Sequence, residues 1–324
     1  MKENAKPVLC AVVGVGYLGR FHAQKYASLK EACLVGVCDA HLETAKRVGE
    51  ELGVPYFTDY HDLLDQVEAV SIAASTPQHY RLAKDFLLKG KHVLLEKPIT
   101  ETVEQAKELI DIAEAQGVKF QIGHLERFNS ARIAVDEHLT YPLFIESERL
   151  APFNPRGADV NVVLDLMIHD IDLLRTYVDS PIIHLDAQGA PVLSSHIDIA
   201  NTYIRFENGC VANLTASRIS FKTERKTRIF QPNAYISIDY QNKKLAVFEK
   251  GAGEMFPGVP EILRHESTFE QKDALLEEIK AFLHCIQEDT VPLVTGKDGL
   301  HALEVATQIT DLIKNHLIRL NDRL

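Results

Sequence analysis

A carboxylate and an amine, Glu96 and Lys97, stand side by side after the apolar residues 93–95 and before Pro98. The apolar run is typical of the end of a buried strand. Because a proline cannot donate the next ladder hydrogen bond, the strand should end here. Open α/β sheets bind their ligands at the carboxyl ends of their strands. Glu96 and Lys97 are therefore candidate functional groups, although taken alone the pair also fits an ordinary charged loop.

A second pair, Asp165 and His169, lies four residues apart in the apolar segment 162–177, which we predict to be a helix. Residues four apart share one helix face. An acid and an imidazole are costly to bury there without partners or a function, so the pair is either catalytic or part of a salt-bridged or capped helix start. We predict no metal site, because helical spacing turns Asp170 and Asp172 away from His169 and no second histidine cluster follows.

The first element that must position these groups is a strand, a glycine-rich turn and a helix. An apolar run at 8–13 leads into Gly14, Gly16 and Gly19, and a helical segment follows at 20–29. Gly14 permits a tight turn, Gly16 lets the backbone approach a pyrophosphate, and Gly19 lets the helix pack close to the strand. The free N–H groups of the helix start then face the phosphates. This is the context that a dinucleotide-binding turn requires.

Asp39 ends the next apolar strand, 20 residues after Gly19, where a ribose-binding carboxylate is expected. It would accept from both ribose hydroxyls and repel a 2′-phosphate, and residues 40–42 offer no arginine to receive one. The sequence thus predicts NAD rather than NADP, while Asp39 can also cap the helix at 42–52. The predicted cofactor site comprises Gly14, Gly16, Tyr17, Leu18, Gly19, Asp39, Ser75, Thr76, His79, Glu96 and Lys97.

Strands and helices continue to alternate up to Gly123. Further strands are predicted at 34–38, 56–57, 69–74, 92–95 and 119–123, with helices at 42–52, 61–66, 80–89 and 102–116. Six strands alternating with helices predict an N-terminal Rossmann domain, a doubly wound parallel sheet, over residues 1–123.

The second half has a different pattern, in which strands dominate. Strand-like runs lie at 143–150, 182–189, 197–206, 210–220, 226–231 and 234–240. Their alternation of polar and apolar residues predicts an open, mainly antiparallel sheet with one covered face. Residues 251–260, rich in glycine and proline, are predicted to be a mobile loop. Two closing helices, at 271–288 and 297–320, can pack back on the first domain. We assign residues 124–324 to an α+β substrate-binding domain.

Composition excludes several function classes. The net charge of −11 argues against nucleic-acid and membrane-surface binding. The five cysteines are odd in number and show no CxxC pair, which indicates reduced residues in a cytoplasmic protein. Residues 1–7 lack the apolar segment of a signal peptide, and no apolar run is long enough to cross a bilayer.

Several motifs occur together and in this order: Gly14, Gly16 and Gly19, then Asp39, then Glu96-Lys97-Pro98, then Asp165 and His169. In this combination the chain resembles the glucose-fructose oxidoreductase / inositol dehydrogenase / rhizopine catabolism (Gfo/Idh/MocA) family. The resemblance implies an NAD-dependent dehydrogenase whose catalytic set is Lys97, Asp165 and His169. It also implies a homo-oligomer built through the C-terminal sheet and a cis peptide bond at Lys97-Pro98.

A narrower resemblance rests on residues 124–129, 149–156, 165–172 and 210–217. They resemble a branch that oxidises the 3-hydroxyl of UDP-N-acetylglucosamine to a ketone, which an aminotransferase converts to a 3-amino sugar for lipid A. The candidate substrate residues are Arg127, Asn129, Arg149, Asn154 and Arg156, with the guanidinium groups suited to phosphate. Each arginine can equally form a salt bridge.

Two questions stay open at this point. His169 is the expected general base, since its unperturbed pKa lies near working pH, but Lys97 could take the proton if its pKa is lowered. A dehydrogenase of a free sugar or polyol such as an inositol is the main alternative function. A non-catalytic NAD-binding regulator is a further one, which the presence of Lys97, Asp165 and His169 disfavours.

Overall fold

The computed structural model describes residues 6–154, 160–270 and 272–321. The chain divides into two compact units, which are described separately. The first unit contains Met1–Leu125 and Asp273–Leu303, and the second contains Glu126–Lys272 and Glu304–Leu324. These bounds differ from the predicted segments 1–123 and 124–324 chiefly because residues 273–303 belong to the first unit.

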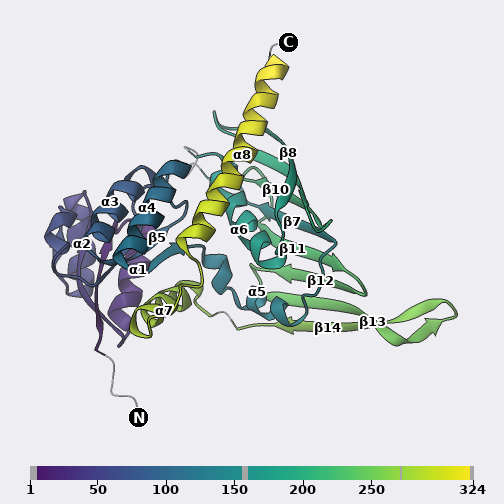
Figure 1. Cartoon of the computed structure of the whole chain (residues 1–324), viewed down its shortest axis with the longest axis horizontal. Helices are drawn as coiled ribbons and strands as arrows, with labels where there is room; N and C mark the ends of the chain where they lie inside the picture. Colours follow the sequence, from purple (N-terminus) through teal and green to yellow (C-terminus); the bar gives the residue numbers. More distant parts are fainter. Residues whose placement is uncertain (1–5, 155–159, 271, 322–324) are drawn as a thin grey trace. The chain divides into compact units, whose positions relative to one another are not determined.

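The first unit is built on a parallel sheet of six strands (Figure 1). The strands are β1 (Val8–Val13), β2 (Ala32–Cys38), β3 (Tyr56–Phe57), β4 (Ala69–Ile72), β5 (His92–Glu96) and β6 (Phe120–Gly123). Their order is β3-β2-β1-β4-β5-β6, with parallel pairing at every step. The strand order reverses direction between β1 and β4, which confirms the predicted doubly wound Rossmann sheet.

Helices separate these strands along the chain. They are α1 (Tyr17–Ser28), α2 (Leu42–Leu52), α3 (Thr76–Leu88) and α4 (Val103–Gln116), with a short 3₁₀ turn at Tyr60–Leu63 and α7 (Ala274–Gln287) returning from the end of the chain. A capping box of Thr102 and Gln105 begins α4, and Gly117 in the left-handed conformation ends it. The prediction that the third helix begins at Tyr80 is wrong: it begins at Thr76, because Ser75 is extended and Pro77 fits the first turn.

The two faces of this sheet are covered by different helices. Helix α1 packs beside α2 and α7, and α3 packs beside α4. The core under α1, α2 and α7 includes the alternating residues Val8, Cys10 and Val12 of β1, together with Tyr26 and Phe282 from the helices. Successive side chains of a strand point to opposite faces of the sheet, so each strand packs against the helices on both faces.

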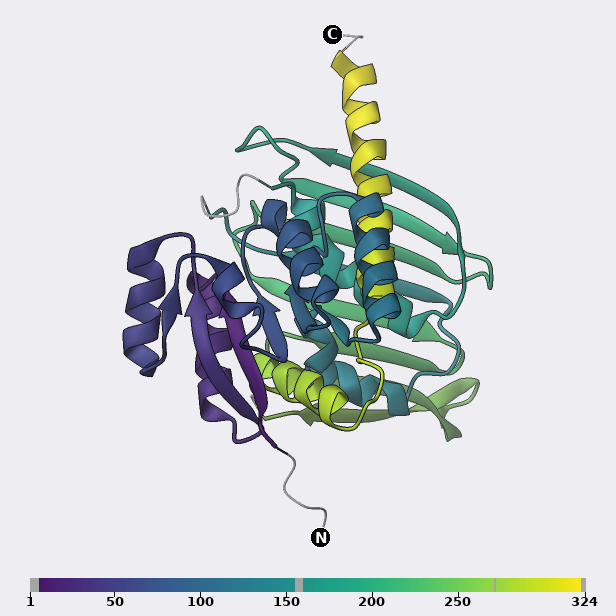
Figure 2. The same cartoon turned by 60° about the vertical axis from the view of Figure 1, so that its left-hand side comes forward.

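The second unit contains a sheet of eight strands, shown side by side in Figure 2. They are β7 (Phe144–Leu150), β8 (Ile182–Ala190), β9 (Ile199–Phe206), β10 (Val211–Ser217), β11 (Glu224–Gln231), β12 (Ala234–Asp239), β13 (Lys244–Phe256) and β14 (Val259–Thr268). Their order is β14-β13-β12-β11-β7-β10-β9-β8. Only the β7–β10 pair among the described strands of this sheet is parallel, which confirms the predicted mainly antiparallel sheet.

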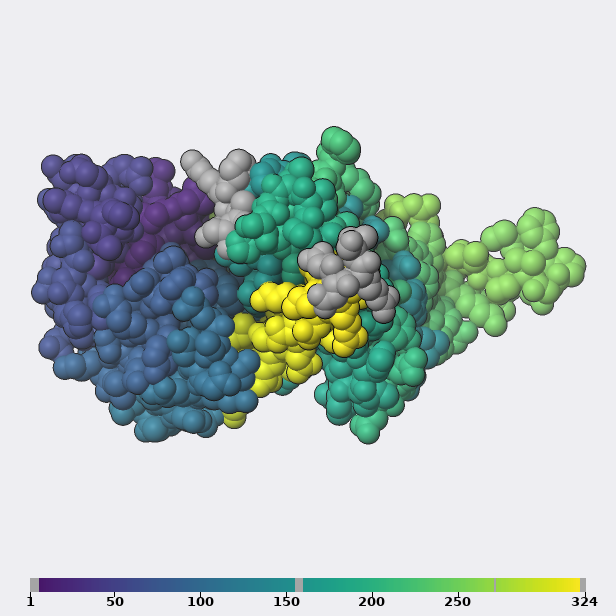
Figure 3. Space-filling view, turned by 90° about the horizontal axis from the view of Figure 1, so that it is seen from above, coloured from purple at the N-terminus to yellow at the C-terminus, as the bar shows by residue number. Residues whose placement is uncertain are grey.

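The predicted mobile loop at residues 251–260 is wrong. This segment forms the end of a hydrogen-bonded hairpin between β13 and β14, whose turn is made by Gly258 at φ 80°. The glycines that suggested a loop have a packing role, since a Cβ at Gly251 would lie 2.6 Å from an oxygen of Glu261 on the facing strand. The hairpin end extends beyond the rest of its sheet (Figures 1 and 3).

The second unit also contains the short helix α5 (Ser130–Ala134), 3₁₀ turns at Leu125–Phe128 and Val135–Glu137, and α6 (Ile168–Tyr177). Helix α8 (Gly296–Asn321) begins in the first unit and ends in the second. Directly before α6, residues Val163–Met167 form a π-helical turn. Within the described ranges, we find no helix that combines the length and the apolar character needed to span a bilayer.

Candidate functional site

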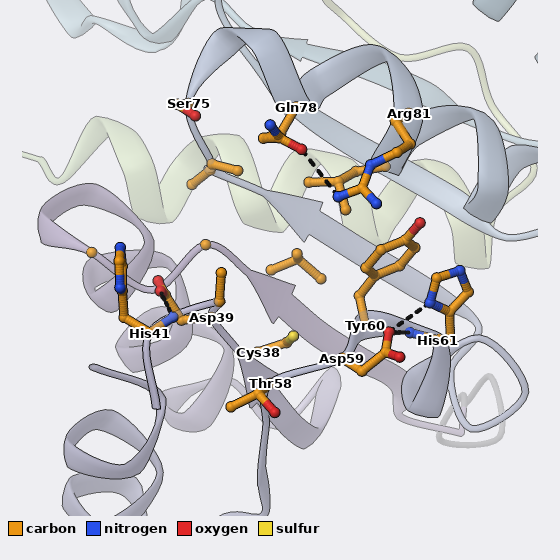
Figure 4. Close-up of a pocket in the computed structure, with 17 residues that line it drawn as sticks. Cys38, Asp39, His41, Thr58, Asp59, Tyr60, His61, Ser75, Gln78 and Arg81 are labelled. Atoms are coloured by element: carbon orange, nitrogen blue, oxygen red, sulfur yellow. Dashed lines mark hydrogen bonds and ion pairs between the residues drawn. The ribbon is translucent and has the colours of Figure 1, made fainter. Parts of the chain in front are cut away.

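A cavity of about 520 Å³ opens at the carboxyl ends of the first unit's strands. Figure 4 shows side chains around it that come from the turns after β2, β3 and β4. Four predicted cofactor residues line it: Gly14, Gly16, Asp39 and Ser75. A volume of this size suits part of a dinucleotide, since small-molecule sites commonly measure about 300–1,000 Å³.

The three glycines of the turn have different structural roles. Gly14 has φ 83°, and a Cβ on it would lie 2.5 Å from the backbone nitrogen of Ala74. A Cβ on Gly19 would lie 1.8 Å from the carbonyl oxygen of Gly14, so only glycine lets α1 start so close to the strand. Gly16 has open space around the Cβ position, which leaves its backbone accessible. The turn therefore fits a pyrophosphate held by backbone groups.

The Asp39 carboxylate is fixed at the end of β2 by two backbone donors. Val15 N–H donates to its Oδ2 and His41 N–H donates to its Oδ1, each at 3.0 Å. The cap residue of α2 is His41, which has no side-chain cap bond, so Asp39 supports the helix start through the His41 amide. A carboxylate oriented by two amides retains further lone pairs for ribose hydroxyls.

Sequence reasoning missed several residues that line the same cavity: His41, Thr58, Asp59, Tyr60, Gln78 and Arg81. The Arg81 guanidinium lies over the Tyr60 ring at 5.3 Å from its centre and donates to Gln78 Oε1 at 3.0 Å. The six residues follow the carboxyl ends of β2, β3 and β4. The strand-end rule applied to Glu96 would therefore have identified them.

Other predicted cofactor residues do not line the cavity. Tyr17 and Leu18 are exposed in the first turn of α1, and Thr76 begins α3. His79 is buried, with its ring nitrogens 2.8 Å from the Pro98 carbonyl and 3.0 Å from the Ala74 carbonyl. Burial lowers the pKa of His79 below its ordinary value, while these carbonyls oppose that shift. His79 therefore ties two strand-end loops together.

Glu96 is the last residue of β5, and the partly buried Lys97 follows it. The Lys97 amide donates to Glu96 Oε2 at 3.3 Å, and the other carboxylate oxygen lies 3.1 Å from His22 Nε2. The Lys97–Pro98 peptide bond is cis, which confirms the expectation from the family resemblance. The strand end thus carries Lys97 at a defined position in the first unit.

Asp165 and His169 belong to the second unit and lie on different kinds of helix. Asp165 is part of the π-helical turn, whose start is capped by the Asn161 side chain through the amides of Val163 and Leu164, both at 3.0 Å. His169 lies in the first turn of α6. The prediction of one continuous α-helix is therefore wrong over Val163–Met167, and the α-helical spacing argument does not apply to this pair. π-helical turns frequently occur at functional sites.

Two of the three predicted substrate arginines, Arg149 and Arg127, make internal ion pairs. Arg149 is buried and donates to both oxygens of Asp170 at 2.8 and 3.0 Å and to Glu126 at 3.0 Å. Arg127 donates to both oxygens of Asp172 at 2.8 and 2.6 Å. Although burial raises the pKa of Glu126, the Arg149 charge holds it below the ordinary value. These contacts assign both arginines a structural role.

The remaining predicted substrate residues differ in position. The Asn129 side chain caps α5 through the Ala131 amide at 3.1 Å and donates to the Tyr240 carbonyl at 2.9 Å. Asn154 is exposed, and Arg156 lies outside the described residues.

The parallel sheet, its glycine turn and the acidic residue at the end of β2 define a dinucleotide-binding domain that is followed by an α+β domain. Comparison with known protein families agrees with this assignment of two domains. The family model described as "Oxidoreductase family, NAD-binding Rossmann fold" matches residues 8–124, and the "GFO/IDH/MocA C-terminal domain" matches residues 131–237. The chain belongs to the Gfo/Idh/MocA family of oxidoreductases, and its cofactor is NAD.

Two curated relatives cover nearly the whole chain. The UDP-N-acetylglucosamine 3-dehydrogenase of Acidithiobacillus ferrooxidans is 37% identical over 309 residues, 95% of this chain and 98% of that protein. The scyllo-inositol 2-dehydrogenase (NAD(+)) of Bacillus subtilis is 27% identical, with coverage of 95% and 94%. A solved structure of the Acidithiobacillus enzyme superposes with a TM-score of 0.90 at 36% identity, covering 95% of this chain and 98% of that one.

Replacing Asp39 by asparagine should weaken NAD binding about tenfold and relax the discrimination against NADP. The variant removes the charge that we expect to accept from ribose and to repel a 2′-phosphate, and a charge-assisted hydrogen bond contributes about 1.5–3 kcal/mol. Asparagine keeps an oxygen for one of the two backbone amides that now bind Asp39, so local order is better retained than in an alanine variant. Fluorescence titration with NADH and NADPH measures both affinities, and an unchanged ratio would remove Asp39 from cofactor selection.

Proposed function

We propose that the protein catalyses NAD-dependent oxidation of the 3-hydroxyl of a UDP-N-acetylhexosamine, converting UDP-N-acetylglucosamine to its 3-keto form. The observation that carries the proposal is the 37% identity to a UDP-N-acetylglucosamine 3-dehydrogenase over 95% of the chain. The glycine turn and Asp39 fit the dinucleotide that such a reaction uses.

We propose Lys97, Asp165 and His169 as the catalytic set, as the family resemblance implies. NAD, when bound, supplies the acceptor for the hydride that leaves the sugar C3. His169 takes the hydroxyl proton, because an imidazole titrates near working pH, and Lys97 donates a hydrogen bond to the same oxygen. Asp165 orients either His169 or Lys97. If Lys97 takes the proton instead, the acidic limb of the pH–rate profile will persist in a His169→Asn variant.

The decisive experiment follows nicotinamide absorbance with NAD and either UDP-N-acetylglucosamine or myo-inositol. Because the equilibrium toward a ketone is unfavourable in many such oxidations, a carbonyl trap or a sugar aminotransferase is included. Reduction with the nucleotide sugar alone is the expected result. Reduction with the polyol alone would leave the catalytic set in place and overturn the proposed substrate.

One structural observation favours the second candidate, a dehydrogenase of a free sugar or polyol. Two of the three arginines predicted to meet the UDP phosphates, Arg127 and Arg149, are ion-paired with carboxylates of their own unit. The relative from Bacillus subtilis is named for scyllo-inositol. A polyol carries no phosphate and would not need free guanidinium groups.

We further propose that the 3-keto product is consumed by an aminotransferase that yields a 3-amino sugar for lipid A, in the cytoplasm. All five cysteines are free thiols, which suits a reducing compartment. Formation of a UDP-3-amino sugar in the coupled assay, detected by mass spectrometry, tests the transamination step. A keto product that no sugar aminotransferase accepts would contradict this assignment.

We propose that the chain forms a homo-oligomer through the open face of the second unit's sheet. Four aromatic side chains run across neighbouring strands there, Phe144, Phe230, Tyr235 and Phe248, with ring centres 5.7, 5.0 and 5.4 Å apart. Each is at least partly exposed, while its neighbour along the strand is buried. A contiguous apolar row on an uncovered sheet face is typical of an interaction surface.

Phe230→Glu should therefore shift the assembly toward smaller species without unfolding the chain, because it places a charge in the centre of the aromatic row. Light scattering coupled to size-exclusion chromatography measures the mass. Phe221→Glu is the matched control, since Phe221 is fully exposed outside the strands. An unchanged mass in the Phe230 variant would exclude this face as the interface.

A further inference from the structure

A polar cluster interrupts the apolar core beneath α1 and α7. It consists of His22 on α1, Glu96 at the end of β5 and Glu278 on α7. One ring nitrogen of His22 and one carboxylate oxygen of each glutamate lie within 4.8 Å of one another. His22 and Glu278 have no exposed surface, and the Glu96 side chain is 12% exposed. Buried groups of this kind need hydrogen-bond partners or neutralisation.

Glu96 and His22 make several hydrogen-bond contacts. Glu96 accepts from the Lys97 amide and contacts His22 Nε2, and the other ring nitrogen of His22 lies 3.3 Å from Ser71 Oγ. The β6 backbone leaves room for the carboxylate, since a Cβ on Gly123 would lie 2.8 Å from both Glu96 oxygens. The Glu96 carboxylate therefore sits between the sheet core and the candidate catalytic Lys97.

Glu278 differs from its neighbours. It occupies one position of the buried stripe of α7, together with Leu275, Ile279 and Phe282. Neither carboxyl oxygen has a hydrogen-bond partner within the described part of the chain, and both are shielded from solvent. An ionised carboxylate at such a position would be very costly.

The electrostatics favour a neutral Glu278. Burial raises its pKa well above the ordinary value, and the nearby Glu96 charge adds to that shift. Tyr26 and Cys10 are titratable groups beside the cluster, and burial raises the pKa of the Tyr26 hydroxyl and of the Cys10 thiol. Two acids so close in an apolar core cannot both ionise at low cost.

The separation also indicates how the proton is used. The carboxyl groups are too far apart for a direct hydrogen bond, yet they lie within 4.8 Å. Two hydrogen bonds of about 2.8 Å that meet at a tetrahedral water span roughly 4.6 Å. A single buried water of this geometry would therefore bridge one oxygen of Glu278 and one oxygen of Glu96, as buried waters commonly do between polar groups.

We propose that Glu278 is a positioning residue: it carries a proton at neutral pH and, through one bound water, donates to the Glu96 carboxylate that orients Lys97. The assignment of Lys97 to the reaction rests on the proposed function. The protonation state of Glu278 does not rest on the proposed function, so either of these two assignments can fail without the other.

Infrared spectroscopy in heavy water tests the protonation directly. The difference spectrum between the wild type and Glu278→Gln at neutral pH should contain the carbonyl stretch of one protonated carboxylic acid. Glu277→Gln, on the same helix but 41% exposed, should show only carboxylate bands. A carboxylate band lost in the Glu278 variant would overturn the proposal, and so would a stoichiometric divalent metal in the purified protein.

The pH dependence of stability provides a second readout. A folded-state pKa above the unfolded value of about 4.3 means that stability is fully present below that value and is lost as the pH rises toward the folded pKa. Glu278→Gln should therefore melt about 3 °C or more above the wild type at pH 8. Near pH 4 the variant and the wild type should melt at the same temperature. An equal melting temperature at both pH values would contradict a neutral buried acid.

Kinetics separate positioning from simple packing. Glu278→Gln should retain turnover at neutral pH because an amide also donates to the bound water. Glu278→Leu should lower kcat about tenfold while the NADH affinity is unchanged. Equal kcat in the leucine variant would exclude a positioning role. Absence of turnover with any tested substrate in the wild type would reject the proposed function, and the infrared and melting results would still decide the state of Glu278.

Discussion

Replacing Lys97 by alanine should lower kcat about 10³-fold while the affinity for NADH is little changed. The side chain follows the end of β5, and its backbone is held by Glu96. In the proposed reaction its ammonium stabilises the charge that develops on the substrate oxygen, and removal of one such donor commonly costs about 10²–10³ in kcat. General acid–base participation of the same group would add to the loss.

The measurement combines steady-state kinetics with fluorescence titration of NADH. Lys89→Ala is the matched control, because Lys89 ends α3 in the same unit with a side chain that is 53% exposed. The control should behave as the wild type. Turnover near the wild-type value in the Lys97 variant would remove this residue from catalysis, whereas a parallel loss of NADH binding would assign it to cofactor binding instead.

The sequence was most informative where local rules determine the structure. The alternation of strands and helices and the Gly14, Gly16 and Gly19 spacing predicted the parallel sheet, because the order of strand, glycine turn and helix can be read within a short segment. Gly19, for example, must fit against the Gly14 carbonyl five residues before it. Asp39 was predictable for the same reason: it ends a strand at a fixed distance from the turn. The cavity-lining residues Tyr60 and Arg81 follow the same logic but were not sought.

The errors arose where distant contacts decide the outcome. Glycine and proline at residues 251–260 suggest a loop, yet pairing with the facing strand makes a hairpin. The π-helical turn at Val163–Met167 follows an apolar sequence that fits an α-helix equally well. The partner of an arginine is also a property of the folded chain: Arg149 and Asp170 are 21 residues apart, and nothing in their spacing predicts their ion pair.

The Arg149→Met variant should lower the free energy of unfolding of the second unit by about 3–5 kcal/mol, the usual cost of breaking a buried ion pair from one side. Methionine fills much of the space but leaves Asp170 without its cation and Glu126 with only the half-exposed Arg225 nearby. Asp170 is 4% exposed and loses two hydrogen bonds, and Glu126 loses the partner that keeps its pKa low. For a unit of this size the melting temperature should fall by about 10 °C.

Arg225→Met is the matched control, because Arg225 contacts the same Glu126 oxygen at 3.6 Å from a side chain that is 50% exposed. An exposed pair contributes about 1 kcal/mol or less, so this variant should melt close to the wild type. Pairing Arg149→Met with Asp170→Leu should recover part of the lost stability, since both buried charges are then removed together. If Arg149 instead binds substrate phosphate, the single variant will raise KM and leave the melting temperature unchanged. KM and the melting temperature of this variant therefore decide whether Arg149 stabilises the second unit or binds the substrate. A substrate role would favour the nucleotide sugar over a free polyol.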